Sequence, residues 1–283
     1  MKNVKFIFIL IHVLSSYFSG AQSRAINYQQ TDKETMNKLL QLFSSEKNTP
    51  SGELMIKTGS YFIGAPYVAN TLEIQPEQLV INLREFDCTT FAENCLAITR
   101  TIKSENPSFE KFCDELKKIR YPNGKIDGYP SRIHYFSDWI YENNKRQVVK
   151  DISKEIANTN YPLQVNFMST HPGSYIQLKN DSILIPLISL QEKEISKREM
   201  YFIPEDKIVE FEKLLKDGDI AGITTGIKGL DMVHVVILKR VNGRIHILHA
   251  STAANKVILS EETLEEYLKK SKSATGIMVA RPL

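Results

Sequence analysis

Apolar residues recur at helical spacing through the first half of the chain and alternate with polar residues in its last third. The stretches 31–45, 88–101, 107–119 and 133–144 carry apolar positions at i, i+3, i+4 and i+7, which predicts amphipathic helices. The runs 220–225, 232–240, 244–251 and 276–283 are rich in β-branched residues, which predicts antiparallel strands. Helices first and a sheet last indicate an α+β fold.

The middle of the chain is more mixed. Turn residues crowd 121–132, the apolar run 182–188 predicts a strand, and 204–219 predicts a short helix. A further strand is predicted at 77–83 and a helix at 261–271. No repeat, low-complexity block or flexible linker marks a boundary, so we expect one domain over 22–283.

The first 21 residues are typical of a secretory signal peptide. Lys2 and Lys5 precede the apolar run 6–14, and Ser19-Gly20-Ala21 supplies small residues before the expected cleavage point. The apolar run is shorter than a membrane span. We therefore expect an exported protein, periplasmic or secreted, without a membrane span after signal cleavage.

Charge excludes some partners. The chain carries 36 Lys and Arg against 33 Asp and Glu, for a formal net charge of +3. Loss of Lys2 and Lys5 with the signal peptide leaves a nearly neutral protein. This balance gives no basis for binding nucleic acid, and no long basic run suggests a membrane surface.

The three cysteines differ in their surroundings. An odd number in an exported chain leaves at least one thiol free or paired between chains. Cys95 and Cys113 lie on apolar stripes, so we expect both in the core. Cys88 follows the N-cap residue Asp87 at a helix start, where unpaired N–H groups and the helix dipole favour the thiolate. By itself Cys88 is either a buried structural residue or a nucleophile.

A hairpin at Asn242-Gly243 organises the histidines. Asn-Gly is the strongest signal for a two-residue hairpin loop. The resulting register makes His234 and His249 diagonal neighbours on one face, roughly 7–8 Å apart at the backbone. His246 points to the opposite face because side chains alternate along a strand.

The histidine pair has three interpretations. His234 and His249 are two satisfied core residues, or a base and its orienting partner that activate Cys88. A Cys–His–His zinc site is the third interpretation, although the sequence suggests no fourth ligand.

Four motifs, in their order along the chain, resemble those of the NlpC/P60 cysteine peptidases. They are GAPYVAN (64–70), FDCTTF (86–91), DGDIAGI (217–223) and the histidine hairpin (234–251). The fuller pattern, with SRIHYFSDWI (131–140) and NFMSTHP (166–172), resembles the DUF1460 branch.

The resemblance implies a papain-like α+β fold, in which N-terminal helices with the nucleophile at a helix start pack on a C-terminal antiparallel sheet. A large insert, about 121–216, would wall the cleft. The implied activity is that of an N-acetylmuramoyl-L-alanine amidase acting on peptidoglycan fragments (muropeptides), without metal or organic cofactor. A γ-D-glutamyl–diamino acid endopeptidase and a non-catalytic muropeptide-binding module remain alternatives.

The resemblance also assigns roles to residues. It implies Cys88 as the nucleophile, His234 as the base and His249 as the third member, with thioester chemistry. Tyr67 would line the site, and Asp87 would lie beside the oxyanion position. The insert offers candidate substrate contacts at Ser131, Arg132, His134, Tyr135, Asp138, Trp139 and His171.

Overall fold

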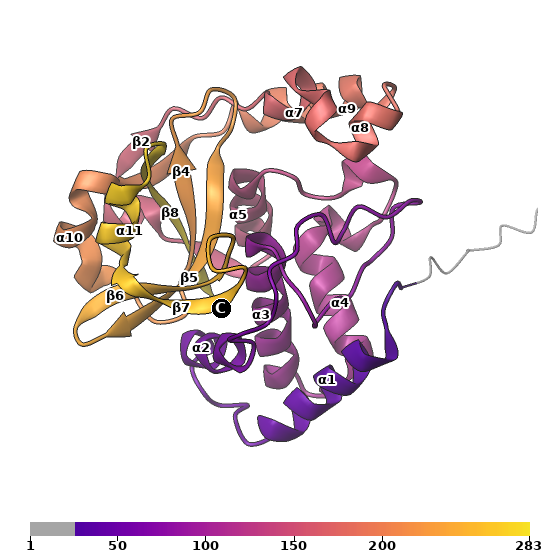
Figure 1. Ribbon diagram of the computed structural model, residues 1–283, viewed down its shortest axis with the longest axis vertical. Helices are drawn as coiled ribbons and strands as arrows, with labels where there is room; N and C mark the ends of the chain where they lie inside the picture. Colours follow the sequence, from indigo (N-terminus) through magenta and orange to yellow (C-terminus); the bar gives the residue numbers. More distant parts are fainter. Residues whose placement is uncertain (1–25) are drawn as a thin grey trace, which may run out of the picture.

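The computed structural model describes residues 26–283, so the expected signal peptide at 1–21 lies outside the described residues. These residues form an eight-stranded sheet between two layers of helices (Figure 1). The strand pairs are antiparallel. The order across the sheet is β2 (Thr159–Tyr161), β3 (Met200–Pro204), β8 (Ala274–Pro282), β4 (Ile220–Thr225), β5 (Met232–Val241), β6 (Arg244–Ser251) and β7 (Lys256–Thr263), and β1 (Val149–Asp151) also pairs with β8.

Helices cover both faces of this sheet. The larger layer consists of α1 (Gln30–Leu42), α2 (Ser51–Tyr61), α3 (Cys88–Lys103), α4 (Phe109–Arg120) and α5 (Phe136–Lys145). The other face is covered by α6 (Ser153–Ile156), α10 (Ile208–Phe211) and α11 (Leu264–Lys270). At one end lie α7 (Phe167–Thr170), α8 (Ile176–Asn180) and α9 (Leu184–Ile195), grouped at the top of Figure 1. Short 3-10 turns complete the chain at Pro122–Gly124, Tyr129–Ser131, Pro172–Ser174, Glu205–Lys207 and Glu212–Leu214.

Strand β5 shows how the sheet separates two cores. Val235 and Ile237 pack in the larger core, whereas Val236 and Leu238 pack in the smaller one. The alternation follows from the two-residue period of a strand. Because both faces are covered, β4 is buried along its whole length.

The mixed α+β architecture and the antiparallel sheet confirm the expected fold class, and the four C-terminal strands form where they were predicted. Two predicted strands were wrong. Residues 182–188 lead into helix α9, because a short apolar run does not by itself distinguish a buried strand from a helix. Within 77–83, Val80 makes only an isolated bridge with Asn27.

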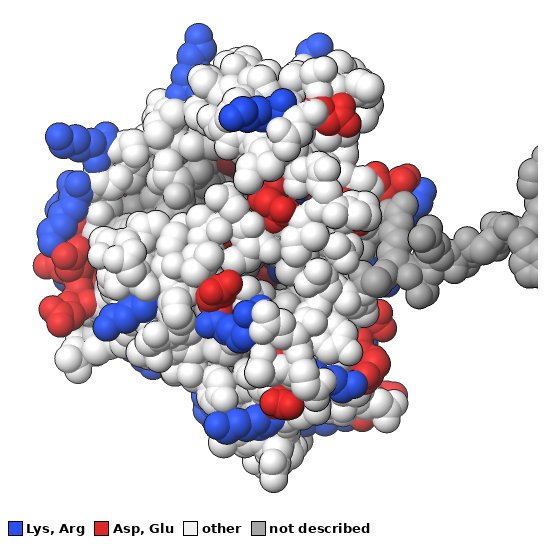
Figure 2. Space-filling model, turned by 45° about the vertical axis from the view of Figure 1, so that its right-hand side comes forward, with Lys and Arg blue, Asp and Glu red and all other residues white. Residues whose placement is uncertain are grey.

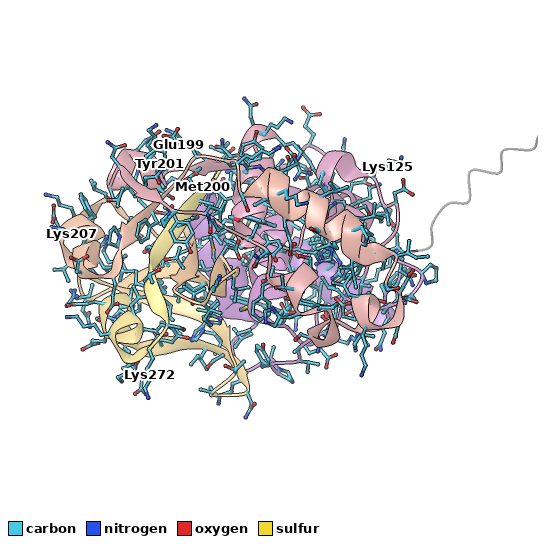
Figure 3. All side chains as sticks on the ribbon, turned by 90° about the horizontal axis from the view of Figure 1, so that it is seen from above. Lys125, Glu199, Met200, Tyr201, Lys207 and Lys272 are labelled. Atoms are coloured by element: carbon cyan, nitrogen blue, oxygen red, sulfur yellow. The ribbon has the colours of Figure 1, made fainter. Side chains whose placement is uncertain are left out.

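Residues 121–216 do more than wall a cleft. They supply β1, β2 and β3, which extend the sheet beyond β8. In the view from above (Figure 3), Glu199, Met200 and Tyr201 lie together where β3 begins. Lys207 and Lys272 project on the sheet side, and Lys125 projects on the opposite, helical side.

The described surface shows no concentration of one charge on the face drawn in Figure 2, where red and blue side chains are scattered over a mostly uncharged surface. Among residues 26–283, no helix has both the length and the apolar character needed to cross a bilayer.

Candidate active site

Cys88 is the first residue of α3, as its sequence context predicts. Asp87 caps the helix in an extended conformation, with its carboxylate accepting a hydrogen bond from the Thr90 backbone N–H at 2.7 Å. The Thr90 hydroxyl in turn accepts from the Asp87 backbone N–H at 2.9 Å. This reciprocal cap fixes the first turn, so the half-buried Cys88 has a defined position.

The histidine pair forms as the hairpin register predicts. Asn242 and Gly243 both have positive φ, 49° and 87°, and occupy the two-residue loop. The Nε2 atom of His234 lies 2.6 Å from the Nδ1 atom of His249. Two lone pairs or two N–H groups cannot face each other at this distance, so one ring donates to the other. The contact therefore couples the tautomers of the two imidazoles, because the ring that does not donate must present a lone pair.

Two hollows meet at Cys88. The inner pocket, about 280 Å³, lies against the insert, with Tyr129, Tyr135 and Tyr175 in its wall. The outer groove, about 950 Å³, lies against β7 and α11. Residues Cys88, Val233 and His234 line both. A substrate bond held at Cys88 would thus have one half of the molecule in each hollow.

The predicted thiolate is not supported by the surroundings of Cys88. Burial, aided by the Asp87 carboxylate, raises the pKa of Cys88 to about 11, although the Val235 backbone N–H and Thr89 oppose the shift. Loss of hydration and a neighbouring negative charge therefore outweigh the helix start. The raised pKa favours a neutral Cys88 thiol over a thiolate at rest.

Both histidines are also neutral at ordinary pH. Burial and the neighbouring His249 lower the pKa of His234 to about 3, and burial lowers that of His249 to about 4. A neutral imidazole can accept a proton. The pair can therefore take the proton of a thiol only as attack proceeds, because the lowered imidazole pKa values and the raised thiol pKa both oppose a preformed ion pair.

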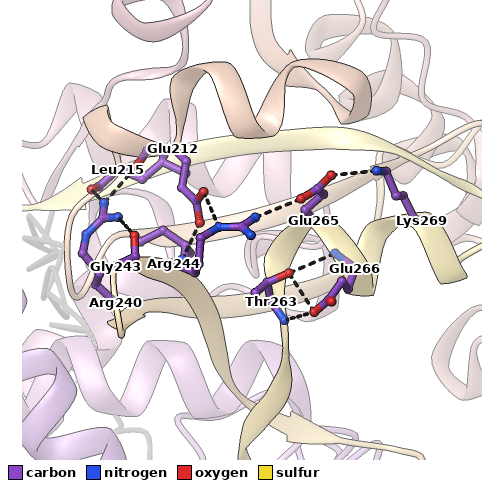
Figure 4. Close-up of polar contacts among 10 residues, drawn as sticks. Glu212, Leu215, Arg240, Gly243, Arg244, Thr263, Glu265, Glu266 and Lys269 are labelled. Carbon is purple, nitrogen blue, oxygen red and sulfur yellow. Dashed lines mark hydrogen bonds and ion pairs between the residues drawn. The ribbon is translucent and has the colours of Figure 1, made fainter.

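Ionic contacts hold the histidine hairpin in place (Figure 4). The Arg244 guanidinium lies 2.9 Å from both Glu212 and Glu265, so it joins the hairpin to the 3-10 turn Glu212–Leu214 and to α11. Arg240 donates to the carbonyl oxygens of Glu212 and Leu215, each at 2.9 Å. The contacts restrict the hairpin end opposite the histidines.

Tyr67 and Asp87 occupy different surroundings. Tyr67 lines the outer groove, and burial together with the charges of Cys88 and Asp87 raises its pKa, so its hydroxyl remains a donor. Asp87 lines neither hollow and its carboxylate is engaged by Thr90. The role that the structure shows for Asp87 is to cap α3, and its place beside the oxyanion position stays a prediction.

The insert candidates separate into two groups. His134 and Tyr135 line the inner pocket. The other five lie outside both hollows, so their contact with substrate stays a prediction. Trp139 is buried against Phe136, and His171 is exposed and stacked on Phe167.

Local partners explain why these polar candidates turn away from the hollows. Arg132 is buried and paired with Glu73 at 2.7 Å and Glu77 at 3.1 Å, so it is not free to bind a peptide carboxylate. Ser131 bonds to the Gly128 carbonyl at 2.7 Å, and Asp138 pairs with Arg198.

Tyr267 is a site residue that motif reasoning missed. Its ring centroid lies 6.1 Å from that of His234 and 5.6 Å from that of His249. It also lines the outer groove, and burial raises its pKa, with a smaller contribution from the charge of a Cys88 thiolate. The predicted helix at 261–271 carries no signal for this contact, because only the fold brings α11 beside the hairpin.

Among the described residues, no group of three or more His, Cys, Asp or Glu side chains is arranged to hold a metal ion. Cys88, His234 and His249 bring together a thiol and two imidazoles, which could serve as a base and an orienting ring. This set can perform nucleophilic acyl transfer.

Comparisons with known proteins found a matching family and similar solved structures. A family model described as AmiA-like, N-acetylmuramoyl-L-alanine amidase-like, matches residues 57–277. An N-acetylmuramoyl-L-alanine amidase from Bacteroides uniformis is similar, with a TM-score of 0.79 and 38% identity over 82% of this chain and 98% of that one. A search of curated proteins gave no match.

Two further solved structures share the fold. A Bacteroides fragilis protein, provisionally described as a xylanase, has a TM-score of 0.76 and 38% identity over 80% of this chain and 99% of that one. The DUF1460 protein LPG0564 from Legionella pneumophila has a TM-score of 0.67 and 21% identity, covering 89% of this chain and 95% of that one.

Proposed function

Since this chain belongs to the AmiA-like, N-acetylmuramoyl-L-alanine amidase-like family, we propose that it is a cysteine amidase of peptidoglycan fragments. It would cut the amide between the lactyl group of muramic acid and L-Ala. The observation that carries the proposal is the bonded pair His234–His249 beside Cys88, at the junction of two hollows. A papain-like NlpC/P60 fold and export to the periplasm or medium are parts of the same proposal.

In the proposed reaction, the Cys88 sulfur attacks the lactyl carbonyl carbon while His234 takes the thiol proton. His234 Nε2–H donates to His249 Nδ1, which leaves His234 Nδ1 free as the base. The backbone N–H groups at the start of α3 and the Tyr67 hydroxyl are candidate donors to the oxyanion. His234 then protonates the departing L-Ala nitrogen, leaving a thioester.

The second half of the reaction returns the enzyme to its resting state. A water molecule gives one proton to His234 and attacks the thioester carbonyl. The C–S bond breaks, the lactyl carboxylic acid leaves, and the sulfur regains its proton from His234. No step requires a metal or an organic cofactor.

The same thiol chemistry would serve a γ-D-glutamyl–diamino acid endopeptidase, and a binding module would not turn over at all. Digestion of a disaccharide-tetrapeptide distinguishes these alternatives by mass spectrometry. We expect a free tetrapeptide and a disaccharide with a free lactyl carboxylate. A disaccharide that retains L-Ala-D-Glu would instead show the endopeptidase and exclude the amidase.

Removing the ring of Tyr267 should weaken catalysis more than removing its hydroxyl. We expect Tyr267→Ala to lower kcat about tenfold, because the imidazole pair loses a packed neighbour and gains water, whereas Tyr267→Phe keeps most of the activity. The acid limb of the kcat/KM profile should also move to higher pH in Tyr267→Ala, since better-hydrated imidazoles protonate more readily. Steady-state assays of both variants across pH measure this; equal losses in both would assign the effect to the hydroxyl instead.

A further inference from the structure

We propose that the two hollows sort the substrate by charge, so that the inner pocket receives the uncharged sugar half and the outer groove receives the carboxylate-bearing peptide. The inference rests on the proposed function and adds an orientation to it. It follows from the different charges that line the hollows on either side of Cys88.

The inner pocket is lined by two carboxylates and by no lysine or arginine among the described residues. Asp231 accepts hydrogen bonds from the backbone N–H groups of Ser137 at 2.7 Å and Met232 at 2.8 Å, which hold it in place. One oxygen of Glu73 is bonded to Arg132 at 2.7 Å, and its other oxygen has no protein partner.

The cationic groups behind the inner pocket do not offset the negative charge of the carboxylates that line it. Arg132 is 7% exposed, is shared between Glu73 and Glu77, and is not among the residues that line the pocket. Burial and the neighbouring Arg132 lower the pKa of His134 to about 3, so this lining residue is neutral. A substrate carboxylate here would face carboxylates without a compensating cation.

A sugar fits the same surroundings. Rings of Tyr129, Phe136 and Tyr175 give the pocket apolar walls against which the C–H faces of a pyranose can pack. Sugar hydroxyls and an acetamido N–H are donors, and the lining carboxyl groups of Glu73 and Asp231 are of the acceptor type. Muramic acid in its amide linkage has no charge of its own, so it meets no repulsion.

The outer groove differs because cations take part in its lining. Lys256 and Lys270 lie there with Glu261 and Glu262. Lys270 is paired with Glu262, whereas no carboxylate of the described residues lies within ion-pair distance of the exposed Lys256. The second residue of a stem peptide, D-Glu, carries a free α-carboxylate, and in a dipeptide its γ-carboxylate is free as well. Lys256 is the available cation for one of them.

The test introduces the same negative charge on either side of Cys88. Ser174 and Lys256 are both exposed, one lining the inner pocket and the other lining the outer groove, so Ser174→Glu and Lys256→Glu should both fold. Each variant is assayed with two N-acetylmuramoyl dipeptides, L-Ala-D-Glu and L-Ala-D-isoglutamine. These substrates differ only in whether the α-carboxyl of the second residue is an acid or an amide.

The preference for the D-Glu dipeptide (the acid) over the D-isoglutamine dipeptide (the amide) is measured as the ratio of their kcat/KM values. We expect Lys256→Glu to lower this ratio about five- to tenfold, with a smaller effect at high salt. Ser174→Glu should lower kcat/KM for both substrates and leave their ratio within about twofold. A larger change of the ratio in Ser174→Glu would place the peptide in the inner pocket. An unchanged ratio in both variants would equally overturn the proposal.

Failure of the amidase assignment can be told apart from failure of this orientation. Calorimetry measures the affinity of Cys88→Ala for the two dipeptide ligands, alone and combined with either charge variant. The ratio of the two affinities reports the same preference without turnover. If wild type does not cut the ligands but Lys256→Glu selectively weakens binding of the acid, the orientation holds and the amidase proposal fails. Absence of both turnover and binding removes the proposed function and this inference together.

Discussion

Replacing Cys88 by alanine should lower kcat on muropeptides by about 10⁴-fold or more, because the proposed thioester cannot form without the sulfur. The fold should survive the change, since the helix cap is made by Asp87 and Thr90 and not by the thiol. Turnover is measured by release of free stem peptide. Binding of uncut substrate, measured by calorimetry, should persist.

Cys95 provides a matched control two turns along the same helix. It is fully buried, and burial raises its pKa strongly, so it is not accessible to a substrate. Cys95→Ala should cost about 1 kcal/mol of unfolding free energy through the lost packing and leave kcat close to wild type. If Cys88→Ala keeps a tenth of wild-type turnover, or if the losses of the two variants are alike, the nucleophile assignment is wrong.

Local sequence signals were sufficient for the parts of the site that depend on short-range geometry. Asp87 in front of Cys88 predicts a capped helix start, and Asn242-Gly243 fixes a register that places His234 beside His249. Both features follow from backbone chemistry within a few residues. The strands around the hairpin were predictable for the same reason.

Features that depend on distant partners were not predictable. Arg132 looks like a substrate anchor in sequence, but Glu73 and Glu77 reach it through the folded chain. Tyr267 joins the histidines only because α11 packs beside the hairpin. The ionisation of Cys88 was misjudged because a helix start is visible in the sequence, whereas burial is not.

The second large effect should come from His234. His234→Ala should lower kcat by about 10³-fold, since no other group on the described site is placed to take the Cys88 proton. His249→Ala should lose about ten- to a hundredfold, because the His234 ring keeps its basicity but loses its hydrogen-bonded orientation. His249→Asn, which can still accept from His234 Nε2–H, should recover much of that loss. Equal losses in His249→Asn and His249→Ala would show that the bond does not orient the base.

The pH profile gives the sharpest test of this pair. The pKa of His234 is lowered to about 3 and that of His249 to about 4, so the neutral base persists in mild acid. We therefore expect kcat/KM to fall only near pH 4. The apparent pKa values of this acid limb belong to the coupled pair and not to either histidine alone. Alkylation of Cys88 by iodoacetamide should rise steadily toward pH 11 without a plateau near neutrality. An unfolded histidine titrates near 6.5, so the unfolded chain binds protons first and stability should fall as pH drops below that value. His249→Asn should reduce this acid sensitivity. A thiol alkylated rapidly at pH 5, with the acid limb near pH 6.5, would instead indicate a thiolate–imidazolium pair and contradict the neutral resting state.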